Sequence, residues 1–440
     1  MTTPIACQLS SAVASAETMK ILLGRGKVYS APYYQQFDPY RNKFVRGKLT
    51  MGMRNPLMRF KKIAIGRLLK KMVNQPRPPM PEPKEKPIER IIDAGLWAPS
   101  ADNIQPWRIE IKDDNYFIIH VRKYTSVTPL LAEIRNGMPN MLAAGMMLEN
   151  IRIAASAEGM AAAYQFQETG DLLHINVSLT ASNSIHKDPL FPYIPIRSVN
   201  RKKYKTTPLT LSQKEEFERS VGNELSVSWH LGLHEKLKCA SLNAKASDIR
   251  LKAKEAYLEI KDMLDWNNRF SNDRIPVRTL PLSPATLCIM RWALKSWSRI
   301  DFLNTYLAGT FMPRLEMDII PGICSAAHFT IESKEPLNEN DMDSLLKMGA
   351  AIQRFWLTAT KLGLVLQPSY AALVFGYLGS RRIEFSKEET LNKKAEKFAT
   401  DFTQLYKKDI NDIVFMGRIG VPAKISDSRS LRKPINELLI

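Results

Sequence analysis

Cysteine is scarce in this sequence, and its distribution excludes two common kinds of structural support. The 440 residues contain four cysteines, at Cys7, Cys239, Cys288 and Cys324. They are far apart and form no C-x-x-C pair, which argues against a disulfide framework and against a zinc site. We therefore expect buried, reduced thiols at these positions.

Long apolar runs and several familiar motifs are also absent. The longest apolar stretches, such as residues 371–378, are too short to span a bilayer, and residues 1–15 lack a charged leader followed by an apolar run. We therefore expect a cytoplasmic protein. The sequence has no G-x-S-x-G motif, phosphate-binding loop or Rossmann fingerprint. It also has no RNA-binding aromatic signature, zinc finger or basic zipper, which argues against nucleic acid as a partner.

Histidine is equally sparse, with six residues in the chain. His230 and His234 are four residues apart, but they lie in the segment W-H-L-G-L-H, which alternates like a strand. Other ligand residues are lacking around this pair, so the sequence predicts no metal site.

Positive charge is abundant, with 63 Lys and Arg residues against 44 Asp and Glu residues and a net charge of +19. Such a charge favours anionic partners, which include phosphates, acidic proteins and anionic lipids. In residues 54–73, basic and apolar residues recur at helical spacing and predict a basic amphipathic helix. This helix either packs on its own protein or contacts an anionic membrane surface or an acidic partner. Residues 75–87 hold six prolines and predict a linker, so we assign residues 51–86 to this helix and linker.

The first 50 residues form an extension. Residues 12–23 predict a helix that ends at residues 24–27. The text A-E-T-M-K-I-L-L-G-R-G-K at 16–27, followed by F-D-P-Y at 37–40, resembles the tail of an adenylating domain of the ubiquitin-activating type. The glycine-rich nucleotide loop of that domain is missing, so the resemblance does not imply adenylation by this chain alone. It leaves open that the extension packs on the main domain or on an adenylating-enzyme partner.

The remainder of the chain contains an internal repeat. Residues 145–159 and 349–363 each begin and end with glycine and have apolar residues at matching helical positions. Each segment predicts a helix closed by a C-cap glycine and followed by a strand. Each is also preceded by a helix and a strand, and each has a further strand downstream. We infer a duplication, with halves at 87–195 and 196–440 and an insertion at about 252–324 in the second half.

The strongest local signal is the loop A-P-S-A-D-N-I-Q-P-W at residues 98–107, between a predicted helix and a predicted strand. Pro99 and Pro106 stiffen the turn. Ser100, Asn103 and Gln105 supply fixed hydrogen-bonding groups, which suit a polar heteroaromatic ligand in a concave site. By residue type alone, the loop is equally typical of an ordinary helix-terminating turn.

This loop matches A-P-S-x-x-N-x-Q-P-W, the hallmark of the nitroreductase family, at every specified position. The resemblance covers about residues 87–440. It implies an α+β fold in which FMN lies between two copies, here fused and degenerate. It also implies hydride transfer from NAD(P)H through the flavin to a small-molecule substrate, either an aromatic or conjugated acceptor or a pathway intermediate. Pro99, Ser100, Asn103 and Gln105 would then bind FMN.

The family's phosphate-binding stretch, R-R-S-x-R, has a counterpart only before the second half. There the sequence reads I-R-S-V-N-R, with Ile196 in place of the first arginine and one additional residue before Arg201. The resemblance implies that Arg197, Ser198 and Arg201 hold the FMN phosphate, with help from Arg432. Arginine suits this role because its planar fork donates two hydrogen bonds to phosphate oxygens.

The resemblance also implies that the backbone near Gln367 and Pro368 lies beside the flavin ring. The corresponding position before the first half offers only Lys84 and Lys86. The two halves therefore keep complementary parts of one FMN site, and a second site is lost.

No catalytic side chain is predicted, because FMN itself carries the chemistry. The insertion contains aromatic and methionine side chains that suit an apolar substrate, although core packing explains them equally well. They include Trp266, Phe270, Met290 and Trp292. Two alternatives remain open: a flavin-binding protein without turnover, whose insertion covers FMN as a lid, and an accessory partner of an adenylating enzyme.

Overall fold

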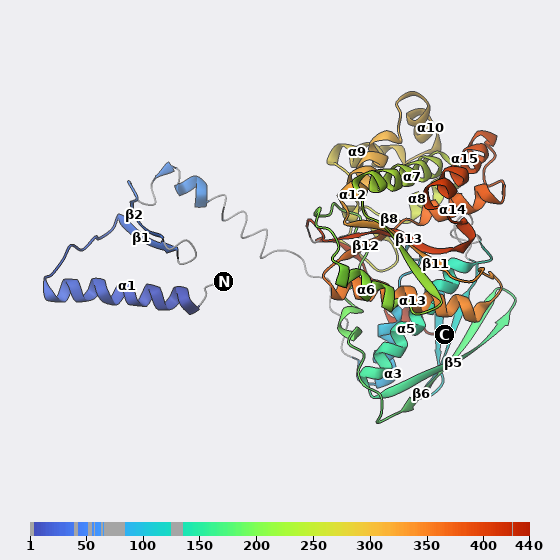
Figure 1. Ribbon diagram of the computed structural model, residues 1–440, viewed down its shortest axis with the longest axis horizontal. Helices are drawn as coiled ribbons and strands as arrows, with labels where there is room; N and C mark the ends of the chain where they lie inside the picture. The colour runs from blue at the N-terminus through green and yellow to red at the C-terminus, as the bar shows by residue number, and fades with distance from the viewer. Residues whose placement is uncertain are drawn as a thin grey trace. The chain divides into compact units, whose positions relative to one another are not determined.

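The computed structural model describes residues 4–38, 43–51, 55–56, 58–62, 65, 84–124, 135–424 and 426–440. These residues belong to two compact units, Met1–Arg77 and Pro78–Ile440 (Figure 1). Among the described helices, none combines the length and apolar character that crossing a bilayer requires.

The first unit consists of a helix and a hairpin. The helix α1 spans Pro4–Leu23, so the expected helix is present and begins earlier than predicted. Gly24 follows it at a φ of +60°, a conformation that favours glycine and ends the helix. Strands β1 (Tyr33–Asp38) and β2 (Lys43–Lys48) pair antiparallel. Most of the basic helix expected at 54–73, and of the linker expected at 75–87, lies outside the described residues.

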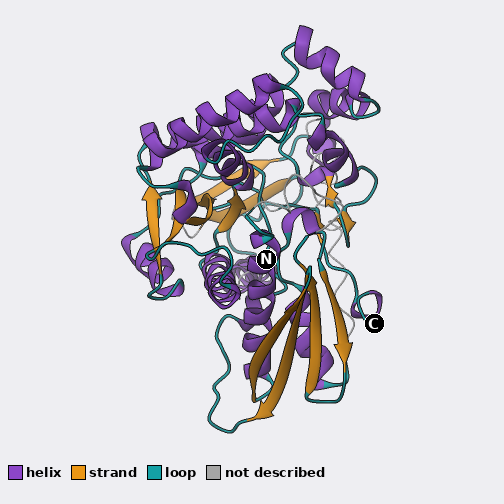
Figure 2. Ribbon diagram, turned by 90° about the vertical axis from the view of Figure 1, so that its right-hand side faces the viewer, coloured by secondary structure: helices purple, strands orange, loops and turns teal. Residues whose placement is uncertain are grey.

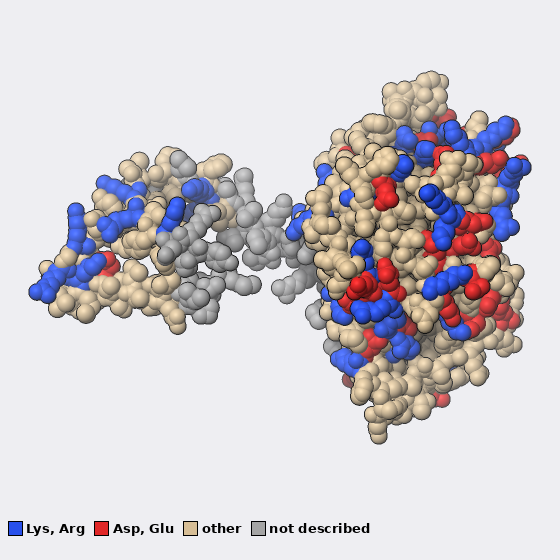
Figure 3. All heavy atoms as spheres, in the orientation of Figure 1, with Lys and Arg blue, Asp and Glu red and all other residues tan. Residues whose placement is uncertain are grey.

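Most of the excess positive charge belongs to this first unit. Residues 1–77 hold 15 of the 63 Lys and Arg residues but 2 of the 44 Asp and Glu residues, so they carry 13 of the 19 net charges. On the face of the second unit seen in Figure 3, basic and acidic side chains are interspersed. Most of the net positive charge that favours anionic partners is therefore carried by residues 1–77.

The second unit is a mixture of helices and small sheets, as predicted at this coarse level. Its first four-stranded sheet has the strand order β3-β4-β6-β5, with antiparallel neighbours throughout. Its apolar residues alternate along β4 and β6, so one face is buried and the other is accessible to solvent. The elements are α3 (Pro87–Leu96), β3 (Trp107–Ile111), β4 (Tyr116–Arg122), α5 (Met138–Ala157), β5 (Met160–Thr169) and β6 (Leu172–Ala181).

The second four-stranded sheet has the order β7-β11-β13-β12 and is also antiparallel. Its central strands are buried on both faces, because helices cover both sides (Figure 2). The helix that precedes β7 in the chain begins with a capping box between Thr210 and Gln213. The elements are α6 (Leu211–Ser220), β7 (Leu225–His230), β11 (Ala327–Ser333), α13 (Met342–Lys361), β12 (Val365–Pro368) and β13 (Ile413–Gly420).

These two sets of elements follow one another in the same order: helix, strand, strand, helix, strand, strand. The spatial order also agrees, because β3, β4, β6 and β5 correspond by chain order to β7, β11, β13 and β12. In both sets the long second helix ends at a glycine with positive φ, Gly159 (+70°) or Gly363 (+69°), as the repeat predicted. The insertion separates β7 from β11 and has no counterpart between β3 and β4.

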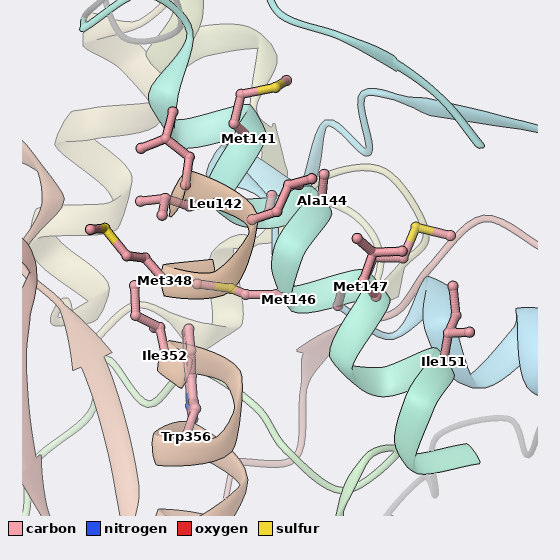
Figure 4. Close-up of a cluster of buried hydrophobic side chains, with 14 of the residues drawn as sticks. Met141, Leu142, Ala144, Met146, Met147, Ile151, Met348, Ile352 and Trp356 are labelled. Atoms are coloured by element: carbon pink, nitrogen blue, oxygen red, sulfur yellow. The ribbon is translucent and has the colours of Figure 1, made fainter. Parts of the chain in front are cut away.

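Helices α5 and α13 form the centre of this unit. Gly145 and Gly349 lie where the two helices meet, and a Cβ on either glycine would collide with backbone oxygen of the other helix. The distances from such a Cβ are 2.1 Å at Gly145 to Leu346 O and 2.2 Å at Gly349 to Leu142 O. Large apolar side chains interlock around this contact (Figure 4). They include Leu142, Met146, Met348, Ile352 and Trp356.

The chain between β7 and β11 begins with a helix, not with a continued strand. Glu235 accepts hydrogen bonds from the backbone N–H groups of Leu231 and Gly232 and so starts α7 (Leu233–Lys252). His234 therefore lies on this helix, and the expected alternation is wrong beyond His230. The other elements are α8 (Glu255–Asp262), β8 (Leu264–Asp265), β9 (Phe270–Ser271), β10 (Ile275–Pro276), α9 (Pro284–Ala293), α10 (Trp297–Tyr306), α11 (Phe311–Arg314), the π-helix η5 (Leu315–Ile319) and α12 (Ile320–Cys324).

Two further helices follow β12, namely α14 (Tyr370–Ser380) and α15 (Glu389–Tyr406). They pack with α7 over a second apolar core. The cysteines differ from expectation: Cys239 is buried in this core, Cys324 is half-buried, and Cys288 on α9 is exposed. The expected burial is wrong for Cys288, because it lies beside the exposed Ile289 on the solvent side of its helix.

The C-terminal segment connects the second set of elements to the first. The Ile109 N–H of β3 donates to Leu438 O (2.8 Å), and the Ile440 N–H donates to Ile109 O (3.0 Å). Upstream, β14 (Arg429–Ser430) pairs in parallel with β9 of the insertion. Residues 429–440 thus contact both the insertion and the first sheet.

Candidate functional site

The loop at residues 98–107 has an unusual backbone. Asp102, Asn103 and Gln105 have φ values of +46°, +66° and +53°, which are uncommon for residues with a side chain. Such strain persists only where surrounding contacts enforce it, and it is concentrated at functional sites. One enforcing contact is internal, because the Gln105 N–H donates to Ser100 Oγ (3.0 Å).

The side chain of Gln105 holds this loop against two distant segments. Its amide donates to Asn272 O of the insertion (2.8 Å), and its Oε1 accepts from the Lys433 N–H (2.9 Å). Gln105 is buried and lines neither of the two cavities described below. Its observed contacts are therefore structural.

Asn103 is bonded to the C-terminal segment. Its Oδ1 accepts from Arg432 Nη1 (2.8 Å), and its Nδ2 donates to Leu431 O (3.2 Å). Arg432 also donates through Nε to Ala98 O (2.9 Å). The loop therefore fixes the position of this guanidinium group with one side-chain amide and one backbone carbonyl.

Two more arginines surround the same loop. Arg197 is 2% exposed, donates to Trp97 O (2.9 Å), and places its guanidinium carbon 4.6 Å from the centroid of the Trp356 ring. Arg429 donates to Pro195 O (2.8 Å) and Arg197 O (3.1 Å). The Nε atoms of Arg197 and Arg429 are buried and have no hydrogen-bond partner among the described residues.

Carboxylates do not neutralise this arginine cluster, which consists of Arg197, Arg429 and Arg432; its hydrogen bonds within the described chain go to carbonyl and amide oxygens. Burial, followed by the charges of Arg432 and Arg429, holds the pKa of Arg197 far below its usual range. Burial, followed by the charge of Arg429, lowers the pKa of Arg432 to about 9. Because a buried, unpaired cation costs free energy, these groups favour an anion beside them.

The arginine cluster lines a small pocket of about 70 Å³. Ser198 and Thr279 contribute hydroxyl groups to it, and Arg201 and Ser100 lie at its border with a larger cavity. Burial lowers the pKa of Arg201 to about 10, although Asp102 acts in the opposite direction. The pocket therefore combines guanidinium groups from residues 197–432 with hydroxyl groups, one of which, that of Ser100, belongs to the loop at 98–107.

The larger cavity has a volume of about 290 Å³ and lies beside the junction of α5 and α13. Its walls are mostly apolar, with Met146, Leu280 and Phe415 among the lining side chains. Gln367 and Pro368 of β12 line it, and Gln367 Oε1 is buried without a hydrogen-bond partner in the described chain. The two cavities share Pro99, Ser100, Asp102, Val199, Arg201 and Ile275, so they are adjacent.

The structure thus brings nine of the ten sequence-predicted residues to one connected site, with Gln105 outside it. The large cavity is lined by Pro99, Ser100, Arg201, Gln367 and Pro368, and the small pocket by Pro99, Ser100, Asn103, Arg197, Ser198, Arg201 and Arg432. Their contacts with a ligand stay predictions.

Sequence reasoning missed several lining residues. Arg429 stands three residues before Arg432, and that short spacing was an available signal. No local pattern indicated Asn243 or Arg250, which reach the large cavity from α7, and Arg418 of β13 was assigned no site role. Conversely, Trp266, Phe270, Met290 and Trp292, which were expected to suit a substrate, do not line it. Trp266 and Met290 pack against the apolar core of the insertion, Phe270 packs against a cluster outside it, and Trp292 is exposed.

Comparison with known proteins gives one distant relative. No protein-family model matches the chain. The chain is similar to an uncharacterized protein of Mycobacterium tuberculosis, with 22% identity over 370 residues, which cover 82% of this chain and 50% of that protein. The chain thus spans about half the length of the relative that it matches.

Proposed function

We propose that this protein is an FMN-dependent oxidoreductase of the nitroreductase type. The observation that carries the proposal is the connected site, in which a cluster of unneutralised arginines adjoins an apolar cavity. A flavin mononucleotide needs both environments, a cationic one for its phosphate and an apolar, partly polar one for its ring. The strained loop that joins them is the segment with the nitroreductase hallmark.

The small pocket fits a phosphate group. Arg197 and Arg429 each have a buried Nε without a protein partner in the described chain, and Ser198 adds a hydroxyl group. Guanidinium groups form charge-assisted hydrogen bonds with phosphate oxygens, and such a ligand would supply the negative charge that the cluster lacks. Asn103 and the Ala98 carbonyl would hold Arg432 ready for this contact.

The large cavity fits a flat ring system. Apolar side chains from α5 and β13 form its walls, and Gln367 supplies a buried amide oxygen with no partner in the described chain. When bound, FMN would supply the hydride chemistry, with NAD(P)H as the reductant. The protein's residues would bind the cofactor, orient it and exclude water from it.

We also propose that the second unit arose by duplication of one nitroreductase-like half. The identical order of elements and strands in the two sets supports this proposal. The reciprocal contact at Gly145 and Gly349 supports it further, because a twofold relation places equivalent residues of two copies opposite each other. On this proposal the arginine cluster would serve one of two related interfaces, and the corresponding position before the first half offers Lys86, which is exposed and pairs with Asp114.

Flavin content tests the proposal. The full chain is purified and saturated with FMN, and its absorbance spectrum is recorded after gel filtration. Arg432→Ala removes charge-assisted hydrogen bonds worth roughly 1.5–3 kcal/mol, so we expect about ten- to hundredfold weaker FMN binding. Lys86→Ala is the matched control and should keep the wild-type flavin content. Equal flavin content in both variants would contradict the site.

Turnover is tested separately by NAD(P)H oxidation with the flavin-loaded protein. Oxidation supported by a quinone or nitroaromatic acceptor is expected for an oxidoreductase. A stably yellow protein that oxidises neither NADH nor NADPH would instead support the lid-covered flavoprotein.

A second function concerns the first unit, which we propose is a docking element for an adenylating enzyme. Its helix α1 exposes apolar side chains near its C-terminal end, and the unit carries most of the excess positive charge. The exposed residues are Met19, Ile21, Leu22 and Leu23. Replacing Ile21 and Leu22 by serine should weaken binding to a purified adenylating enzyme from the same cell, and unchanged binding would contradict the proposal.

A further inference from the structure

One face of helix α7 contributes polar side chains to the wall of the large cavity. Asn243, Ser247 and Arg250 line the cavity, and their spacing of four and three residues places them on one side of the helix. Asn243 is buried, and its Nδ2 has no hydrogen-bond partner in the part of the chain that the structure describes. An unsatisfied buried amide donor indicates a missing acceptor.

Arg418 of β13 lines the same region and is 4% exposed. One of its nitrogens, Nη2, donates to Met317 O (2.8 Å), while its Nε is buried without a partner among the described residues. Arg250 resembles it, because its Nε is also buried and unpartnered there while its Nη2 lies 3.5 Å from Asp102 Oδ2. Arg250 and Arg418 thus each place at one wall of the large cavity an N–H donor that has no hydrogen-bond partner among the described residues.

Two carboxyl groups offset part of this charge. Asp102 lies beside Arg250, and Asp318 lines the cavity from the π-helix η5, a type of helix that is frequent at functional sites. Burial raises the pKa of Asp318, against the effect of Arg418, and its Oδ2 has no hydrogen-bond partner within the described residues. Arg201, which lines the small pocket as well, lies beside the same groups, so three cations face two carboxyl groups and leave an excess of one positive charge if both carboxyl groups are ionised.

This polar wall is distinct from the phosphate pocket. Asn243, Arg250 and Arg418 do not line the small pocket, and the arginine cluster does not line the large cavity. Apolar side chains also line the large cavity, among them Met146, Met263 and Leu280. The large cavity therefore combines a polar wall with apolar walls, and it adjoins the small pocket at Asp102 and Arg201.

We propose that Asn243, Arg250 and Arg418 form a binding subsite for the carboxylate of an anionic substrate whose remaining body is apolar, such as an aryl or conjugated carboxylic acid. The inference rests on the proposed function and names the substrate class of the same site. A single carboxylate balances the excess charge of this wall and accepts hydrogen bonds from planar guanidinium groups. A dianionic phosphate at this wall would face both Asp102 and Asp318, whereas Asp318 does not line the small pocket.

The test compares two probes of the same shape, cinnamate and cinnamamide, which differ in charge. Their binding to the full-length protein is measured by titration calorimetry, both before and after saturation with FMN. We expect cinnamate to bind at least about tenfold more tightly than cinnamamide. Arg250→Gln should reduce cinnamate affinity by a similar factor and leave cinnamamide unaffected.

Lys245→Gln is the control, because Lys245 is on the same helix but forms an exposed ion pair with Asp401. It should leave cinnamate binding unchanged. Arg250→Lys keeps the charge and should retain part of the affinity, and circular dichroism checks that each variant is folded. Equal affinities for the two probes, or an unchanged cinnamate affinity in Arg250→Gln, would overturn the subsite.

The two proposals can fail separately. If the protein never retains FMN but discriminates cinnamate from cinnamamide through Arg250, the oxidoreductase proposal fails and the subsite stands. If the protein is yellow and shows no such discrimination, the subsite is wrong and the flavin site stands.

Discussion

Several side chains at this site form hydrogen bonds that fix the positions of other residues of the site. Asn103 is the clearest case, because its Oδ1 accepts from Arg432 while its Nδ2 anchors the loop to Leu431 O. Asn103→Ala should therefore weaken FMN binding about tenfold through loss of the ordered Arg432, as measured by equilibrium dialysis. The control is Asn176→Ala, which removes a similar amide that accepts from Tyr116 on the first sheet. Equal affinities in the two variants would argue against the positioning role.

His328 gives a residue-scale prediction for pH. It is buried, its Nε2 lies 3.1 Å from Gly322 O, and burial, followed by the charge of Arg418, lowers its pKa to about 3. The folded protein thus keeps His328 neutral, whereas the unfolded chain binds a proton below a pH of about 6.5. Stability should therefore fall as the pH falls from 6.5 toward 3, by about 1.4 kcal/mol per pH unit for this group.

The measurement is urea unfolding at pH 6.5 and at pH 4.5, for the wild type and for His328→Gln. Carboxyl groups contribute to the pH dependence of both proteins, so the difference between the two slopes isolates His328. The variant should lose less stability on acidification, and parallel losses would show that His328 is not kept neutral.

At the scale of elements, the crossing of α5 and α13 depends on two glycines. A Cβ at Gly145 would lie 2.1 Å from Leu346 O, so Gly145→Ala forces the helices apart. We expect a loss of roughly 1–3 kcal/mol in the free energy of unfolding, or more, by denaturant titration. Because the large cavity is lined from both helices, FMN affinity should fall as well.

Gly222→Ala is the comparison, because Gly222 has a φ of +75° and an added methyl group there would meet no atom within 4 Å. It should cost only the backbone strain of roughly 1–2 kcal/mol and leave FMN affinity unchanged. A smaller effect of Gly145→Ala than of Gly222→Ala on FMN affinity would contradict the importance of the crossing.

Elements with a local signal were predictable from the sequence. Helix α3 follows from Pro87 at its start and from apolar residues at helical spacing, and the ends of α5 and α13 follow from Gly159 and Gly363. The start of α7 was not predictable, because the alternating residues before His234 imitate a strand until Glu235 caps the helix. The local sequence pattern cannot distinguish a strand from a helix where the residues are compatible with both.

The site was predictable where a motif lies in one segment, and not where separate segments meet. The loop at 98–107 and Arg197 were identified by their resemblance to motifs of the nitroreductase family. Arg250 and Arg418 were not, because only the packing of α7 and β13 brings them to one cavity. Asn103 and Gln105 were assigned to FMN, and the structure adds contacts with Arg432 and Lys433 that sequence spacing could not reveal.

At the scale of the whole molecule, one chain should bind one FMN. All segments that line the small pocket belong to one chain, and the position before the first proposed half offers Lys86, which is exposed and paired with Asp114, in place of arginines. We expect a stoichiometry of one flavin per chain, from absorbance, in particles of monomer mass by light scattering at low concentration. Two flavins per chain, or flavin only in inseparable dimers, would contradict this.

The segments that form the small pocket are connected by hydrogen bonds between residues that are very far apart along the chain. Asn103 and Leu431 are separated by 328 positions, and Ala98 and Arg432 by 334. Closing such loops costs chain entropy before any contact compensates for it, so these contacts slow folding. The binding pocket should consequently be among the last parts to form during refolding, and a flavin would associate with a chain whose cores are already built.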